Sequence, residues 1–118
     1  MPIRPNEPEG GPILRLFEVT AKPGCGAPLL EKFATTSARV VRGEPGNTGY
    51  FFGQEIGVEG ETVLFASVWQ DLDAVKARFG DDWQVSFLPD GYEALIETCS
   101  VRHVDLSDGW HLELLEPS

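Results

Sequence analysis

Three side chains that can take part in chemistry stand within apolar runs of the sequence. His103 and Arg15 each lie in a run rich in β-favouring residues, and Trp69 closes a third such run. An imidazole titrates near neutrality and can take a phenolic proton, and a guanidinium can hold a phenolate or a carboxylate. An indole ring can stack on an aromatic molecule or donate its N–H. We therefore predict that Trp69 and His103 are catalytic and that Arg15 binds the anionic part of a substrate.

Each of these residues also has a purely structural explanation. Trp69 can be a large core residue at the end of a strand, and His103 can be hydrogen-bonded within a sheet. Arg15 can form an ion pair with Glu18 or with an acidic neighbour across the sheet. Aromatic residues can line a binding cavity or fill the core, and we assign five of them to substrate binding: Phe17, Tyr50, Trp83, Phe87 and Tyr92.

No sequence motif points to a metal or a cofactor. His103, Asp105 and His111 have the residue types of a non-haem iron site, but the second histidine lies close by in a C-terminal tail. Cys25 and Cys99 fit no zinc pattern. The sequence also lacks a phosphate-binding loop, a dinucleotide motif and a nucleophile elbow. We expect neither a metal nor a cofactor.

Hydrophobic periodicity predicts the elements that would position these residues. Strands are predicted over residues 13–20, 48–54, 62–69 and 98–106, and helices over 28–42 and 72–79. Asp90 and Glu93 have the spacing of a capping box for a further short helix through Glu97. The order strand, helix, strand, strand, helix, strand is typical of a ferredoxin-like α+β fold with an antiparallel sheet.

The predicted domain covers residues 13–106, between a flexible N-terminal arm at 1–12 and a C-terminal tail at 107–118. Within the domain, residues 81–89 are largely apolar but have neither a strand nor a helix period. Connections of this length without regular structure often carry function. We expect this segment to form the lid of a cavity, with Trp83 and Phe87 facing inward.

Composition excludes several classes of partner. The chain has 118 residues, enough for one domain, and a net charge of −10. Such a surface repels nucleic acid and anionic lipid. No apolar run approaches the ~20 residues of a membrane span, and the first residues lack the apolar stretch of a secretory signal. We expect a cytoplasmic protein that binds neither nucleic acid nor membrane.

The predicted strands also indicate a homodimer. Both faces of 13–20 and 62–69 are mostly apolar, whereas a sheet with one face in water would alternate cleanly. An exposed apolar sheet face is best buried against a second copy of the chain. The alternative, a tail folded over that face, offers too few residues to cover a sheet.

Several runs, taken in order, resemble the antibiotic biosynthesis monooxygenase family. They are Ile13–Phe17 with Lys22–Gly24, Glu44–Tyr50, Phe65–Leu72, Gly91–Tyr92 and Val101–His103. The resemblance implies a homodimer with back-to-back sheets, called a dimeric α/β barrel. It also implies a ligand cavity in each subunit between the sheet and its own helices. Some members oxidise phenolic polyketides with O2 without a cofactor, some act on quinol-like molecules and others cleave haem.

The chain departs from two of these activity patterns. Haem-degrading members use an asparagine in the first strand and a histidine on the second helix, and residues 13–20 and 72–79 contain neither. The polyketide oxygenases place an asparagine before the tryptophan, where this chain has Leu64–Ala66; only Trp69 carries over. The resemblance thus favours a cofactor-independent monooxygenase acting on a small aromatic or quinol-like molecule. The alternatives are a non-catalytic ligand-binding dimer and a haem-binding or haem-degrading protein.

Overall fold

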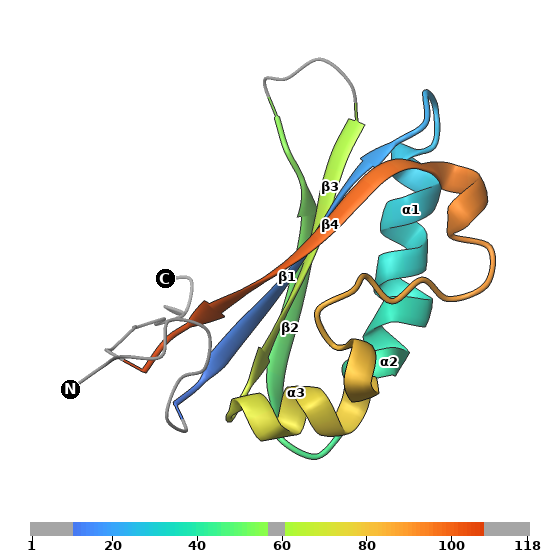
Figure 1. Ribbon diagram of the computed structural model, residues 1–118. Coiled ribbons are helices and arrows are strands. Elements are labelled where there is room, and N and C mark those ends of the chain that lie inside the picture. The colour runs from blue at the N-terminus through green and yellow to red at the C-terminus, as the bar shows by residue number, and fades with distance from the viewer. Residues whose placement is uncertain (1–10, 57–60, 108–118) are drawn as a thin grey trace, which may run out of the picture.

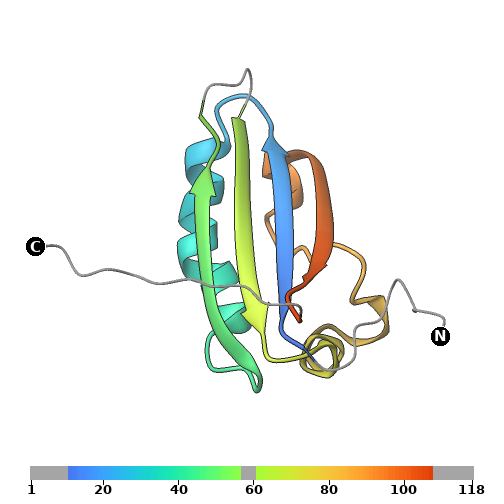
Figure 2. The same cartoon turned by 90° about the vertical axis from the view of Figure 1, so that its left-hand side faces the viewer.

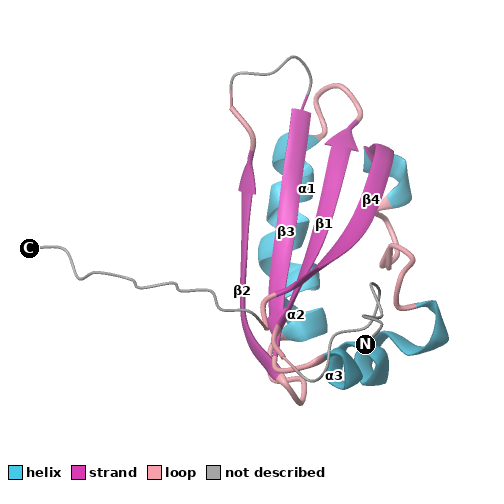
Figure 3. Ribbon diagram, turned by 60° about the vertical axis from the view of Figure 1, so that its left-hand side comes forward, coloured by secondary structure: helices cyan, strands magenta, loops and turns pink. Residues whose placement is uncertain are grey.

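The computed structural model describes residues 11–56 and 61–107 and has the predicted ferredoxin-like α+β architecture (Figure 1). Four antiparallel strands form one sheet in the order β2-β3-β1-β4. The main elements are β1 (Ile13–Ala21), α1 (Gly26–Lys32), α2 (Ala38–Val41), β2 (Asn47–Gln54), β3 (Glu61–Trp69), α3 (Leu72–Phe79) and β4 (Ile96–Asp105). Within these residues, all helices lie on one face of the sheet, and the other face carries no helix (Figures 2 and 3).

Strand β1 shows how the sequence separates the two faces. Its residues alternate between buried and half-buried along the whole strand, with the odd-numbered positions Ile13 to Ala21 buried. The odd positions face the helices, because the Phe17 ring packs 6.0 Å from that of Phe33 in the helical layer. The even positions, including Leu14 and Leu16, face the open side. Alternation with period two is the geometry of any strand.

The first helical region is continuous, but it is not a uniform α-helix. A π-helical turn, Phe33–Ser37, joins α1 to α2. Leu29, Phe33, Ser37 and Val41 are all buried and recur at every fourth position. In an α-helix each step of four rotates a side chain by about 40° around the axis, so this face would drift away from the sheet. The wider π turn reduces that drift and keeps the four residues on one side.

The bounds of α3 match the predicted range of 72–79, and the first helical region lies within two residues of the predicted 28–42 at each end. Helix α1 begins at Gly26, two residues before the predicted start at Pro28, and the Glu61 carboxylate accepts hydrogen bonds from the Gly24 and Gly26 N–H groups at 2.5 and 2.9 Å. Asp71 caps α3, since its carboxylate accepts from the Ala74 N–H at 2.8 Å. Gly80 ends α3 with a φ of +74°, a conformation that glycine adopts without strain.

The predicted helix from Asp90 through Glu97 is wrong. The structure has only a 3₁₀ turn, Glu93–Leu95, and no side chain caps it. Strand β4 begins at Ile96, where Ile96 pairs with Ala21 of β1. A helix this short does not recover the cost of its first turn, whereas pairing with a strand does.

The sheet face is covered by two different kinds of structure. The first helix covers β2 and β3, while α3 lies near one end of the sheet (Figures 1 and 2). The segment 80–95 runs back from α3 and covers the part beside β1 and β4. It contains two 3₁₀ turns and otherwise no helix or strand. The predicted loop at 81–89 is therefore part of the wall that encloses the core.

Aromatic side chains form the centre of the core between these layers. Phe33 lies 6.0 Å from Phe17, 5.6 Å from Phe65 and 6.4 Å from Tyr92, measured between ring centroids. Phe33, Tyr92 and Trp69 are all but inaccessible to solvent. Within the described residues, no helix is long and apolar enough to cross a membrane. The predicted arm, most of the predicted tail and His111 lie outside the described residues.

Candidate functional site

The site begins with a row of side chains that crosses all four strands. Tyr50 on β2 pairs with Ser67 on β3, Ser67 pairs with Arg15 on β1, and Arg15 pairs with His103 on β4. Residues paired across a sheet point to the same face, and here that face is the helical one. On one side of this row lies a second row formed by Phe52, Phe65, Phe17 and Val101. The sheet thus presents one polar row beside an aromatic one.

Arg15 is the charged centre of the row and is 5 % exposed. Its Nη1 donates to the Trp83 carbonyl at 2.5 Å and lies 3.0 Å from Nε2 of His103. Its Nη2 donates to the Val85 carbonyl at 3.3 Å. The guanidinium carbon also lies 3.8 Å from the centre of the Phe79 ring. Arg15 therefore ties the segment 80–95 to the sheet.

No carboxylate in the described part of the chain forms an ion pair with Arg15. The suggested partner, Glu18, lies on the opposite face of β1 and pairs with Arg102 at 3.1 Å. Burial, together with the nearby charge of Arg78, lowers the pKa of Arg15 to about 10. Arg15 remains charged at neutral pH. A buried cation is costly unless it is paired, so the site favours an anionic partner.

His103 supports Arg15 from the neighbouring strand. Burial, and then the charge of Arg15, lower the pKa of His103 to about 4. At neutral pH the ring is neutral, and Nε2 accepts the hydrogen bond because a guanidinium can only donate. The Trp83 ring packs edge-on against it, with centroids 4.9 Å apart. The structure thus places both His103 and Trp83 around Arg15.

Trp69 lies next to the polar row and holds Ser67. It is fully buried, and its indole Nε1 donates to Ser67 Oγ at 2.9 Å. Its ring packs edge-on against Phe79, with centroids 5.8 Å apart. Trp69 therefore contacts two residues of the site, one through a hydrogen bond and one through its ring.

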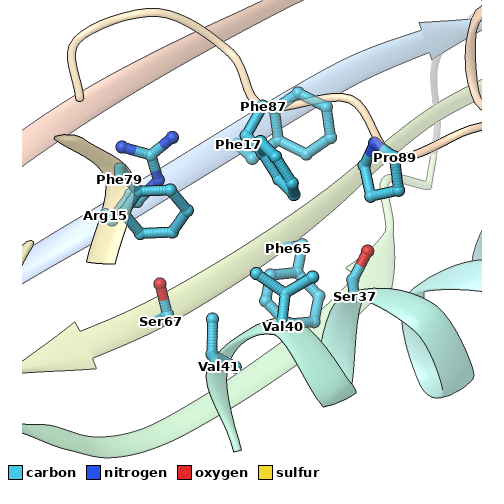
Figure 4. A pocket seen from close by; sticks show the side chains of 10 residues that line it. All are labelled: Arg15, Phe17, Ser37, Val40, Val41, Phe65, Ser67, Phe79, Phe87 and Pro89. Carbon is cyan, nitrogen blue, oxygen red and sulfur yellow. The ribbon is translucent and has the colours of Figure 1, made fainter. Parts of the chain in front are cut away.

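A cavity lies between the sheet, the first helix, α3 and the segment 80–95. It is lined by Arg15, Phe17, Ser37, Val40, Val41, Phe65, Ser67, Phe79, Phe87 and Pro89 (Figure 4). Arg15 and Ser67 lie toward one end of it, and Ser37 and Pro89 toward the other. Its volume is about 40 Å³, which suits a few water molecules and is smaller than the ~150 Å³ of a cavity known to bind benzene.

The structure brings three of the predicted site residues to the cavity wall: Arg15, Phe17 and Phe87. The other five lie behind it or beside it. Trp69, His103 and Trp83 contact lining residues, as described above. Tyr50 stacks on Phe65 at 5.7 Å between centroids. The Tyr92 hydroxyl lies 2.6 Å from Ser37 Oγ.

Three functional candidates were missed by sequence reasoning: Ser37, Ser67 and Phe79. Ser67 shares the buried face of β3 with Phe65 and Trp69, and a polar residue on a buried face is a usable signal. Ser37 lies four residues from both Phe33 and Val41 on the helix, so the same signal applies. Phe79 gave no such signal, because an apolar residue is expected in the helix predicted over 72–79 and its contact with Arg15 depends on how α3 ends.

The described residues contain no group of three or more histidine, cysteine, aspartate and glutamate side chains arranged to hold a metal ion. The local charge is instead positive. Besides Arg15, Arg78 lies 5.3 Å from the Phe79 ring and 5.5 Å from the Phe87 ring. Arg78 is itself paired with Glu44 at 3.6 Å. A protein with a net charge of −10 thus places two cations at this one site.

Comparison with known proteins assigns the chain to a sequence family. The family described as antibiotic biosynthesis monooxygenase matches residues 12–82. This range contains β1, β2, β3 and α3, together with Arg15, Ser37, Ser67 and Trp69. It ends before Phe87 and His103. No protein with a curated description has a significantly matching sequence.

Crystal structures with the same fold come from several bacteria. PA3566 of Pseudomonas aeruginosa is 22 % identical, with 80 % of this chain and 93 % of that chain covered and a TM-score of 0.62. NE2512 of Nitrosomonas europaea, of unknown function, is 17 % identical over 92 % and 97 %, with a TM-score of 0.60. A single-site mutant of SnoaB, a cofactor-independent oxygenase of Streptomyces nogalater, is 18 % identical over 91 % and 98 %, with a TM-score of 0.56. At these identities the likeness concerns the fold.

Proposed function

Because this chain belongs to the antibiotic biosynthesis monooxygenase family, we propose that it is a cofactor-independent monooxygenase that oxidises a small quinol-like aromatic molecule. One observation carries the proposal. Arg15 is a buried cation without a carboxylate partner in the described chain, and it stands at one end of a cavity lined by aromatic rings. An aromatic oxyanion matches both features, since its charge pairs with Arg15 and its ring packs against Phe17 and Phe65. SnoaB, which shares the fold, is a cofactor-independent oxygenase.

In this reaction the substrate supplies the electrons. A quinol and O2 give a hydroxyquinone and water: one oxygen atom enters the ring as a hydroxyl group, and the two phenolic protons leave with the other oxygen atom. Ionisation of the quinol raises its electron density and prepares it for O2. The contribution of the protein is to hold the anion in a dry, positively charged site.

The residues divide into those that touch the substrate and those that position them. Arg15 binds the oxyanion, Phe17 and Phe65 pack against the ring, and Phe87 closes over it. His103 accepts from Arg15 Nη1 and fixes its orientation, and Trp69 does the same for Ser67 through its indole N–H. Trp69 and His103 thus act through their neighbours. Tyr50, Trp83 and Tyr92 hold the wall, as their contacts with Phe65, His103 and Ser37 indicate.

A ring enters this site only if the wall moves, because a volume of about 40 Å³ is too small for it. The segment 83–89 is the part best suited to move. Phe87 is 46 % exposed and Val85 is 61 % exposed, and the segment belongs to no strand or helix. Displacement of Phe87 would enlarge the cavity without disturbing the sheet. This supports the role of residues 81–89 as a lid.

The proposed active form is a homodimer, and its cellular site the cytoplasm. Members of this family are generally dimeric. The open face of the sheet carries Leu14, Leu16, Leu64 and Val68, and the side chains of Phe51 and Val104 add to it with exposures of 51 % and 43 %. An apolar patch of this kind, which here lies beside the Glu18–Arg102 ion pair on the same face, is typical of a subunit interface. A second copy packed on this face leaves the cavity free, because the cavity lies on the helical side.

Oxygen uptake tests the proposal. The purified protein is incubated with a panel of hydroquinones, naphthohydroquinones and anthrones, without added metal, flavin or haem. We expect faster O2 consumption than in protein-free controls for at least one quinol. Mass spectrometry should then show a product that has gained one oxygen atom and lost two hydrogen atoms. Uptake equal to the control across the whole panel contradicts an oxygenase and leaves a ligand-binding dimer.

A further inference from the structure

The hydroxyl group of Ser37 can only accept hydrogen bonds from a molecule in the cavity. Tyr92 Oη lies 3.1 Å from the Lys32 carbonyl oxygen and 2.6 Å from Ser37 Oγ. A carbonyl oxygen only accepts, so the single phenolic proton is committed to Lys32. Ser37 must therefore donate its own proton to Tyr92. This leaves lone pairs, and no proton, on the Ser37 oxygen for a ligand.

The opposite end of the cavity has the reverse polarity. The Trp69 indole N–H can only donate, and it donates to Ser67 Oγ at 2.9 Å. The Ser67 proton remains for a ligand. Arg15, directly across from Ser67 in the sheet, also only donates. Partners in the described chain account for three of its five N–H bonds.

We infer from these directions and from the buried charge of Arg15 that the cavity, once enlarged by displacement of Phe87, takes a hydroquinone as its monoanion, in a single orientation. The oxyanion lies against Arg15 and Ser67, and the remaining hydroxyl group donates to Ser37 at the other end (Figure 4). The ring lies between, against Phe17 and Phe65. This inference rests on the proposed function and names the substrate class of the same site.

The different hydrogen-bonding character of the two ends of the cavity disfavours molecules related to hydroquinone. An aryl methyl ether brings no proton to Ser37, and a quinone brings acceptors to both ends. A catechol has its two oxygens on adjacent carbons, so it presents both of them to the same end of the cavity. A ring with oxygens on opposite sides, one ionised and one protonated, matches both ends. Buried polar groups left unpaired by the wrong ligand make such discrimination strong.

The test measures binding under argon, so that no oxidation takes place. Hydroquinone, 4-methoxyphenol and catechol are titrated into the protein, and dissociation constants are obtained from NMR chemical-shift changes. We expect hydroquinone to bind about tenfold more tightly than 4-methoxyphenol, which corresponds to one hydrogen bond. Catechol should bind no better than 4-methoxyphenol. Equal affinity for all three probes, or no binding of hydroquinone, overturns the inference.

Two variants distinguish an effect of the Ser37 hydrogen bond on binding from a general loss of structure. Ser37→Ala should abolish the preference through weaker binding of hydroquinone. Tyr92→Phe should also abolish it, but through tighter binding of 4-methoxyphenol, because the freed Ser37 proton can then donate to the ether oxygen. Thr35→Ala is the matched control on the same π turn, since Thr35 Oγ1 bonds to the Glu31 carbonyl at an exposed site, and it should retain the tenfold ratio. An unchanged ratio in Ser37→Ala contradicts the inference.

The outcome of these binding measurements is independent of the outcome of the oxygen-uptake experiment. If the predicted affinities hold but no quinol raises O2 consumption, the ligand assignment stands and the oxygenase proposal falls. If a quinol is oxidised but Ser37→Ala does not change the ratio of the affinities for hydroquinone and 4-methoxyphenol, the oxygenase proposal stands and the assignment of the ligand's orientation falls.

Discussion

In its proposed role, Arg15 binds the substrate anion at a cost to the fold. It is buried, carries a lowered pKa and has no carboxylate partner in the described chain. Replacing such a charge with an apolar residue of similar shape is often neutral or stabilising. The carbonyls of Trp83 and Val85, which accept from Arg15, lie in a partly exposed segment where water can replace it. Replacing Arg15 should therefore weaken ligand binding without lowering the stability of the fold.

We predict that Arg15→Met leaves the free energy of unfolding unchanged or raises it, as measured by urea denaturation. The same variant should bind hydroquinone at least tenfold more weakly, because a charged hydrogen bond is lost. Arg15→Lys is the control. Lysine keeps the charge but lacks the planar guanidinium that bonds to two carbonyls and His103. The affinity of this variant for hydroquinone should therefore lie between those of the parent and Arg15→Met. A large loss of stability in Arg15→Met would mean that the residue is structural.

Trp69→Phe removes the indole N–H and keeps most of the aromatic bulk. The hydrogen bond to Ser67 is buried, so its loss should cost about 1 kcal/mol of stability and leave the fold intact. Ser67 is then no longer held in position at the donor end of the cavity. We expect weaker quinol binding or slower turnover at unchanged near-ultraviolet circular dichroism. If Trp69→Phe turned over an identified substrate with the same kinetics as the parent protein, Trp69 would have only a structural role in the core.

His103 makes stability depend on pH in a defined window. Its pKa is about 4 in the folded protein, against 6.5 for a free side chain. Between these values the unfolded chain binds more protons than the folded one, so stability falls as pH falls from about 6.5 to 4. The loss should be on the order of 1–2 kcal/mol after solvent screening, and His103→Gln should reduce it. Denaturation midpoints measured across this range check the sign.

At the scale of elements, the lid is the part that the structure predicts to move. Arg15 ties residues 83–85 to β1, while Phe87 is half exposed. We predict that backbone amides of residues 83–88 exchange with deuterium much faster than those of β1. Hydroquinone should slow this exchange, and Arg15→Met should speed it. Exchange as slow as that of β1, with no effect of ligand, would contradict a lid.

The sequence was sufficient to predict the elements, but not the details of the wall. Strands and caps follow local rules, so β1, β3 and the Asp71 cap were predictable from their residues. The helix predicted from Asp90 failed because pairing of Ile96 with β1 is a contact between distant residues. Arg15 was predicted because a cation is unusual in an apolar strand, and Phe17 and Phe87 were predicted because aromatic side chains can line a cavity. Ser37 and Ser67 were not, since their roles depend on hydrogen bonds that only the assembled fold creates.

For the whole molecule, the main prediction concerns the open face of the sheet. Leu64→Glu places a charge in the middle of that face, where a dimer would bury it at high cost. We expect light scattering at micromolar concentration to give a dimer mass for the parent and a monomer mass for this variant. Thr35→Glu on the exposed helical side is the control and should stay dimeric. A monomeric parent would contradict the proposed assembly.

The central claim is that Arg15 holds an aromatic substrate as its anion. The most direct measurement is the ionisation of bound hydroquinone, followed anaerobically by the ultraviolet difference spectrum of the aryl oxide as pH is varied. We predict that the parent protein lowers the pKa of the bound ligand below that of free hydroquinone, and that Arg15→Met does not. Binding of hydroquinone with an unshifted pKa, or with the same shift in both proteins, would contradict it.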